Sequence, residues 1–133
     1  MPQVRDADPL SEGPPRPLSE RLPRLAADGR HFFTLHAGGG RPMYGEEVRR
    51  GAGGSAWRRF DPHRSKTAAA LRAGGLGPEF EAVLSCRPLL YLGAASGTSL
   101  SHLADIVAPS AAFGVEVAPR SFADLLENLK PWP

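Results

Sequence analysis

One loop and one acidic residue in the C-terminal half of the sequence have the types and spacing of a nucleoside site. Small residues fill the loop Gly93–Gly97, which follows a short apolar run and precedes a stretch with helical periodicity. Such a loop lets a ligand approach the backbone, and the helix behind it offers unpaired N–H groups and a positive dipole end. Glu116 follows 23 residues after Gly93, where an acidic side chain typically binds the two hydroxyls of a ribose. The chain is therefore predicted to bind a cofactor that contains a nucleoside.

The spacing of the loop glycines favours a cofactor without phosphates. The loop has the form G-x-x-x-G and lacks the middle glycine of G-x-G-x-x-G, which lets a pyrophosphate approach the backbone. S-adenosylmethionine is therefore favoured over NAD. A tight strand–helix turn built only for packing and an unrelated Rossmann-type NAD protein stay open as alternatives.

Alternating strand and helix signals surround this loop. The apolar run Pro88–Leu92 predicts a buried parallel strand, and the residues after the loop place apolar side chains at i, i+3 and i+7, on one face of a helix. A second strand is predicted at Ala112–Val117, and Pro119 fits the first turn of a second helix. The resulting β-α-β-α order requires a parallel strand pair with a right-handed crossover.

The residues before this unit divide into segments of different composition. Residues 1–29 contain six prolines and no aromatic residue, so we expect a disordered tail. Residues 30–60 alternate β-prone runs with glycines, which predicts a small antiparallel sheet with Trp57 and Phe60 on its last strand. Residues 61–133 carry the β-α-β-α unit, preceded by predicted helical stretches.

One of those helices begins next to a lysine. Ser65 is the predicted N-cap of a helix over Lys66–Arg72, and Gly74 and Gly75 are the predicted stop. Of the 16 basic residues only Lys66 and Lys130 are lysines. Neighbouring groups can lower the pKa of a lysine, whereas an arginine stays charged.

Size and composition exclude several classes of protein. The chain has 133 residues, enough for one ordinary domain, and no run of 18 apolar residues that would span a membrane. A net charge of +2 does not by itself indicate nucleic-acid binding. The single Cys86 excludes an internal disulfide, suits a reducing compartment and is expected to be a small buried residue.

Four motifs together are more specific than any of these features. They are MYGE at 43–46, RRFDPHRSKTAAA at 58–70, LYLGAASGTSLSHLADIV at 90–107 and GVEVAPR at 114–120. In this order and spacing they resemble archaeal fibrillarin, the S-adenosylmethionine-dependent 2′-O-methyltransferase of box C/D ribonucleoproteins. The resemblance implies an α/β chain with a small N-terminal antiparallel β-subdomain, followed by the first β-α-β-α part of a Rossmann-like methyltransferase sheet.

The same resemblance implies the activity and the partners. Members of the family transfer a methyl group to a ribose 2′-hydroxyl of rRNA or tRNA, at a nucleotide that a box C/D guide RNA selects. The implied protein partners are a Nop-type scaffold protein and, indirectly, a kink-turn-binding ribosomal-type protein, with no membrane involved. The implied location is cytoplasmic, or nucleolar in a eukaryote. A non-catalytic remnant that binds the scaffold protein or RNA is the alternative.

Site residues follow from the matched motifs. The resemblance implies that the cofactor contacts Gly93, Ala94, Ala95, Ser96, Gly97, Thr98 and Ser99, with Glu116 at its ribose and Val117 beside its adenine. Lys66 matches the lysine of the family's RSK motif, where an ammonium would orient the ribose oxygen and stabilise its developing charge. A solvated surface lysine is the alternative. No metal is predicted, because the His and Cys residues lack ligand spacing.

Other polar residues receive weaker assignments. His102 is expected to be structural, and Tyr44 with Glu46 to order the junction between the subdomains. His63 and Arg64 would either contact an RNA phosphate or serve as a turn residue and a surface charge. The family's remaining catalytic residues follow the second strand, beyond the matched motifs. We therefore expect this chain to be incomplete for catalysis and an apolar edge of its sheet to be open.

Overall fold

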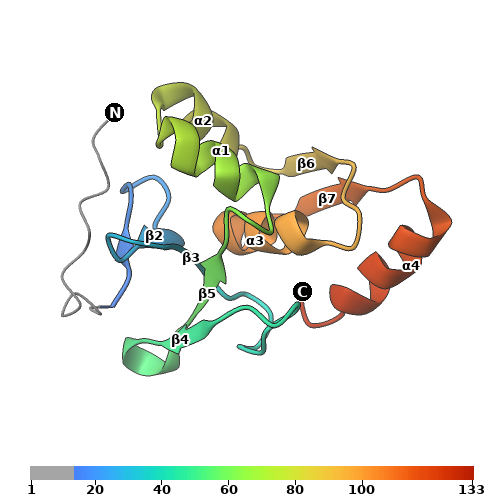
Figure 1. Cartoon of the computed structure of the whole chain (residues 1–133), viewed down its shortest axis with the longest axis horizontal. Coiled ribbons are helices and arrows are strands. Elements are labelled where there is room, and N and C mark those ends of the chain that lie inside the picture. The colour runs from blue at the N-terminus through green and yellow to red at the C-terminus, as the bar shows by residue number, and fades with distance from the viewer. Residues whose placement is uncertain (1–13) are drawn as a thin grey trace.

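The computed structural model describes residues 14–133, which form two sheets and four α-helices (Figure 1). In chain order the elements are β1 (Arg16–Pro17), β2 (Leu25–Ala27), β3 (Phe32–Leu35), β4 (Val48–Arg50), the short 3-10 turn η1 (Ala52–Gly54), β5 (Ala56–Phe60), α1 (Lys66–Gly74), α2 (Pro78–Leu84), β6 (Leu89–Leu92), α3 (Thr98–Val107), β7 (Ala112–Val115) and α4 (Pro119–Asn128). The order and the types of these elements agree with the α/β class that the sequence predicts.

The first sheet is antiparallel and has the strand order β1-β2-β3-β5-β4. Its central pair runs from Phe32 opposite Phe60 to Leu35 opposite Trp57. The β4–β5 hairpin turns through η1. The backbone at Gly53 has a φ of 66° there, a left-handed conformation that favours glycine. The predicted antiparallel sheet is thus present, with Trp57 and Phe60 on β5.

This sheet also includes part of the segment that was expected to be a disordered tail, residues 1–29. Residues 1–13 lie outside the described residues, but β1 and β2 extend the sheet beyond β3. Leu22 and Leu25 are fully buried, and burial of apolar surface favours order. Pro17 is tolerated because it lies on the edge strand β1. The β-subdomain therefore starts near residue 16 and not at residue 30.

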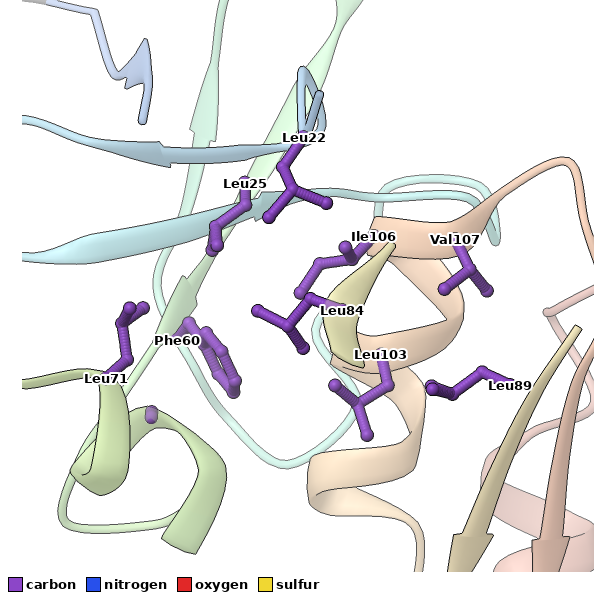
Figure 2. Packing of buried hydrophobic residues seen from close by; sticks show 10 residues of the cluster. Leu22, Leu25, Phe60, Leu71, Leu84, Leu89, Leu103, Ile106 and Val107 are labelled. Carbon is purple, nitrogen blue, oxygen red and sulfur yellow. The ribbon is translucent and has the colours of Figure 1, made fainter. Parts of the chain in front are cut away.

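The hydrophobic core lies between the first sheet and the helices, as Figure 2 shows. Its buried members come from the N-terminal strands and turns, from α1, α2 and β6, and above all from α3: Leu22, Leu25, Phe60, Ala68, Leu71, Leu84, Leu89, Leu103, Ile106 and Val107. Helix α3 contacts both β3 and β7. It therefore joins the two sheets into one structure.

The predicted crossover unit is confirmed. Strands β6 and β7 are parallel, with Leu89 opposite Ala112 and Leu92 opposite Val115, and α3 connects them. The caps of α1 are also as predicted, because Ser65 Oγ accepts a hydrogen bond from Ala68 N and the chain leaves the helix at Gly75. A helix-breaking φ of 68° at Gly75 explains this end.

Burial in the second sheet differs from the prediction. Leu89 is buried, but Leu90 and Leu92 are 62% and 71% exposed, and Phe113 on β7 is 56% exposed. The prediction of a buried strand therefore holds only at the start of β6, and within the described residues these apolar side chains lie on an uncovered face of the sheet. Cys86 is exposed and not buried, because it follows α2 at the surface. No helix among residues 14–133 is long and apolar enough to cross a membrane.

Candidate cofactor site

The loop after β6 folds back tightly on the second sheet. The N–H groups of Gly93 and Ala94 both donate to the carbonyl oxygen of Val115 on β7, each at 2.9 Å. The backbone is left-handed at Gly93, Ala95 and Gly97, with φ of 77°, 49° and 98°. The loop is thus fixed to the carboxyl ends of both parallel strands, where ligands bind in open α/β sheets.

Gly97 shows why this loop needs a glycine at its end. A Cβ atom there would lie 2.8 Å from Leu125 Cδ1 on α4. As the N-cap of α3, Gly97 has no side chain that could accept from the first-turn N–H groups of the helix. Those groups, beginning at Thr98 and Ser99, are left for a ligand or solvent.

Glu116 stands directly after β7 and faces the loop. Its carboxylate accepts hydrogen bonds from Ala95 N at 2.5 Å and Ala118 N at 3.1 Å. These backbone N–H groups lower the pKa of Glu116, so the side chain is ionised and acts as an acceptor. Val117 follows with 92% of its surface exposed. The structure thus brings Glu116 and the predicted loop together.

Sequence analysis missed one residue that supports the loop. Asn128 at the end of α4 donates from Nδ2 to the carbonyl oxygen of Ser96 at 3.0 Å. A single asparagine late in an amphipathic helix carries no sequence signal of such a contact. Together with Leu125, it holds α4 against the loop.

Lys66 is connected to the same region through its neighbour. It is the first residue of α1 and is exposed. The hydroxyl groups of Ser65 and Ser99 lie 2.7 Å apart and share a hydrogen bond, which ties the start of α1 to the first turn of α3. Lys66 forms no ion pair with any other residue between 14 and 133. Its ammonium is therefore exposed and not engaged in an ion pair within these residues.

A buried polar network fixes α3 from the other side. The guanidinium of Arg58 on β5 donates to Glu46 at 2.8 Å, to Asp105 at 2.9 Å and to Ser101 Oγ at 3.0 Å. The side chains of Arg58 and Asp105 are fully buried, and that of Glu46 is 1% exposed. One cation thus faces two carboxylates, and other donors must compensate the second negative charge.

Those donors are present on both carboxylates. Asp105 also accepts from Thr34 Oγ1, Ala37 N and Trp132 Nε1, at 2.8, 2.9 and 2.8 Å. Glu46 accepts from the backbone N–H groups of Met43 and Tyr44. Burial opposes ionisation of Glu46, but these hydrogen bonds and Arg58 lower its pKa.

His102 belongs to this network and is fully buried. Its Nδ1 lies 2.7 Å from Thr34 Oγ1, and its Nε2 lies 2.7 Å from the hydroxyl of Tyr44. Because the hydroxyl proton of Thr34 goes to Asp105, Nδ1 must donate, and Nε2 accepts from Tyr44. Burial, with Arg58 nearby, lowers the pKa of His102 well below its ordinary value. The imidazole is neutral and structural, as expected.

Comparison with known proteins identifies the family of this chain. The model of the fibrillarin family matches residues 25–131. The chain belongs to the fibrillarin family. A fibrillarin-like rRNA/tRNA 2′-O-methyltransferase of Methanosarcina mazei is 38% identical over 112 residues, which cover 84% of this chain and 55% of that relative. One of Haloarcula marismortui is 43% identical over 104 residues, covering 74% of this chain and 43% of the relative.

Two solved fibrillarin structures share the fold. Aeropyrum pernix fibrillarin, in complex with natively bound S-adenosyl-L-methionine, has a TM-score of 0.71 and 34% identity, covering 85% of this chain and 50% of that one. The Methanococcus jannaschii fibrillarin pre-rRNA processing protein has a TM-score of 0.66 and 30% identity, covering 80% and 46%. The chain spans about half the length of the curated relatives it matches.

In this fibrillarin-family chain the remaining assigned residues are placed as follows. Tyr44 and Glu46 order the subdomain junction through the network, as expected. The guanidinium of Arg64 stacks over the Tyr44 ring at 5.0 Å, and His63 is exposed in the turn before α1. Within residues 14–133, no group of three or more His, Cys, Asp or Glu side chains converges to hold a metal ion.

Proposed function

We propose that this chain contributes the cofactor-binding part of an S-adenosylmethionine-dependent RNA ribose 2′-O-methyltransferase. The observation that carries the proposal is the loop Gly93–Gly97, held against Glu116 and linked to Lys66 through the Ser65–Ser99 hydrogen bond. Membership of the fibrillarin family supports it, and so does the cofactor bound by Aeropyrum pernix fibrillarin.

The residues of the loop fit this cofactor. The ionised carboxylate of Glu116 would accept from the two ribose hydroxyls, and the exposed side chain of Val117 would lie against the adenine. The N-cap Gly97 leaves the first-turn N–H groups of α3 without a side-chain cap, so they would be available to the cofactor. S-adenosylmethionine supplies an electrophilic methyl group when bound. The residues Gly93–Ser99 would position it.

Lys66 would act on the RNA. A ribose 2′-hydroxyl is a weak nucleophile, and its proton must leave as the oxygen attacks the methyl carbon. The ammonium of Lys66 would donate a hydrogen bond to that oxygen and stabilise its developing negative charge. Its exposed position at the start of α1 leaves it accessible to an RNA strand.

Membership of the fibrillarin family supports a proposal for the partners. A box C/D guide RNA would select the nucleotide in rRNA or tRNA, and a Nop-type scaffold protein would hold the chain on the complex. A kink-turn-binding ribosomal-type protein would bind the guide RNA and act indirectly. The proposed location is the cytoplasm.

Methyl transfer by a chimera tests this proposal. Residues 25–131 replace the matching part of the Methanosarcina mazei relative, and the chimera is assembled with guide RNA, target RNA and the archaeal partner proteins. We expect methylation of the guided ribose, and a loss of at least about 100-fold for Lys66→Ala. Lys130→Ala is the matched control, because Lys130 is the other lysine and lies on the surface beside Glu127.

Two results would contradict the proposal. One is a folded chimera that binds the cofactor but transfers no methyl group. The other is full activity of the Lys66→Ala chimera, which would remove Lys66 from the reaction and leave it a surface lysine.

A further inference from the structure

A pocket with a volume of about 380 Å³ lies in the β-subdomain, outside the cofactor loop. It opens between the β2–β3 turn, the turn after β5 and the last part of α1. We call it the arginine pocket, after its charged and titratable lining of Arg30, His31, Arg59, Asp61, His63 and Arg72. Pockets of this volume commonly hold small molecules or parts of larger ligands.

The charge of the arginine pocket is positive. Three guanidinium groups face one carboxylate, that of Asp61. Among residues 14–133, none of Arg30, Arg59 and Arg72 forms an ion pair or donates a side-chain hydrogen bond. Nearby Asp28 is already engaged, because it accepts from Arg49 and from two backbone N–H groups. The arginines of the pocket therefore have free donor capacity.

Two buried nitrogen atoms in the pocket, Arg59 Nε and His31 Nδ1, are shielded from solvent. Neither has a hydrogen-bond partner among residues 14–133, and Arg59 Nε–H is a donor whatever the state of the imidazole. The carboxylate oxygen nearest to His31 Nδ1 is on Asp28 at 3.7 Å, which is too long for a hydrogen bond. Buried polar groups without partners are rare in folded proteins and call for an explanation. An anionic ligand in the pocket would provide an acceptor for Arg59.

The lining also points to the kind of anion. Guanidinium groups match phosphate oxygens with parallel N–H donors. Phe32 in the wall is partly exposed and offers a face on which a base can stack. His63 in the lining is three residues before Lys66, so this side of the pocket is next to the start of α1 along the chain.

We propose that the arginine pocket binds a backbone phosphate of the RNA strand whose ribose reaches Lys66. The identification of the ligand as RNA rests on the proposed function. The pocket and its free donors are features of the structure and do not depend on that function. Arg30 and Arg72 at the rim attract the strand, and Arg59 inside donates to a phosphate oxygen. The pocket thereby sets the distance of the RNA from the cofactor loop.

Binding of a short single-stranded RNA to the full chain tests the proposal by fluorescence anisotropy. The double variant Arg30→Gln/Arg72→Gln is compared with Arg16→Gln/Arg21→Gln, which removes the same charge from exposed positions outside the pocket. We expect about 10-fold weaker binding only for the first variant, and a log–log salt slope smaller by about 0.7, as the loss of one phosphate contact predicts for a single strand.

A direct readout follows the Arg59 side chain. In an NMR titration with inorganic phosphate and with the same RNA, we expect the Arg59 Nε–H resonance to shift. The Arg49 Nε–H group is the control, because it already donates to Glu47 at 2.6 Å. No shift at Arg59, no RNA binding by the wild-type chain, or equal RNA affinities of the two double variants would overturn the proposal.

The experiment also separates this proposal from the proposed function. Arg30→Gln/Arg72→Gln should bind S-adenosylmethionine as the wild type does, because the pocket contains no residue of the cofactor loop. If the wild-type chain binds no S-adenosylmethionine, and Arg30→Gln/Arg72→Gln still weakens RNA binding, only the proposed function is refuted. Loss of affinity for an acidic peptide with unchanged affinity for RNA would instead show that the ligand is a protein.

Discussion

The two sheets of the molecule are both rich in apolar residues but bury them to different extents. In the antiparallel sheet, Phe33 and Phe60 are fully buried. In the parallel pair, Leu92 and Phe113 are 71% and 56% exposed. Helices α1 and α3 pack on the first sheet through the core of Figure 2, whereas the described residues leave much of β6 and β7 open. The antiparallel sheet is thus covered by a core to which α1, α2 and α3 contribute, whereas the parallel pair contributes mainly Leu89.

The first turn of α3 and the rest of the helix show the same contrast in their polar groups. From the fourth residue on, Ser101, His102 and Asp105 are buried and every one is hydrogen-bonded. In the first turn, Thr98 and Ser99 are partly exposed, and the N-cap Gly97 provides no side-chain cap. The buried network fixes the helix in place, whereas the N–H groups of its first turn are left for a ligand or solvent.

Breaking the network should have the largest effect. Arg58→Met leaves two buried carboxylates, Glu46 and Asp105, without their cation. We expect the free energy of unfolding to fall by about 3–5 kcal/mol, measured by urea denaturation. Arg21→Met is the control, because Arg21 is 66% exposed and lies 3.6 Å from Glu81. A surface pair of this kind contributes about 0–1 kcal/mol. Similar losses of unfolding free energy for Arg58→Met and Arg21→Met would therefore contradict a stabilising role of the buried network.

Equivalent truncations in the core and on the parallel sheet test the contrast in packing. Leu103→Ala removes a side chain of α3 that is 4% exposed, and should cost about 2–5 kcal/mol. Leu92→Ala removes one on β6 that is 71% exposed, and should change stability by less than about 0.5 kcal/mol. Denaturation of both variants measures the difference. A large loss for Leu92→Ala would show that β6 is covered in solution.

Acid should weaken the network before it affects the carboxylates. The folded-state pKa of His102 is lowered well below 6.5, so below about pH 6.5 the unfolded chain binds one more proton than the folded chain. The stability due to neutral His102 is present above that pH and is lost as the pH falls. We expect a slope of about 1.4 kcal/mol per pH unit between about pH 5 and 6.

Urea denaturation across this range measures the slope. Ring-proton NMR provides a second readout, in which the His102 resonance should not titrate over this range. A flat stability profile, or a His102 resonance that titrates near pH 6.5, would contradict the assignment of a neutral imidazole.

Local features of the fold were predictable from the sequence, because their causes are local. Ser65 caps the start of α1 and Gly75 caps its end, and the spacing of apolar residues predicts α3. The alternation of Ala56, Arg58 and Phe60 on β5 also contained a signal, since the arginine shares its face with two buried residues. Its partner Asp105 lies 47 residues away, and no local pattern indicates such a pairing.

Other features depended on tertiary contacts. The prolines before residue 24 obscured strands β1 and β2, which are stabilised by burial of Leu22 and Leu25. The candidate site was predictable as a loop with an acidic residue because both follow strand ends. The contact of Asn128 with Ser96 and the Ser65–Ser99 hydrogen bond join segments more than thirty residues apart, so only the structure shows them.

Calorimetric titration of the chain with S-adenosylmethionine tests the central claim, that the loop and Glu116 form its site. We expect binding at one site, with an affinity about 10- to 100-fold lower for Glu116→Gln, because a charged acceptor is lost. Asp124→Asn on the exposed face of α4 is the matched control and should bind as the wild type does. Binding of NAD in preference, or equal affinities of wild type and Glu116→Gln for S-adenosylmethionine, would contradict the account.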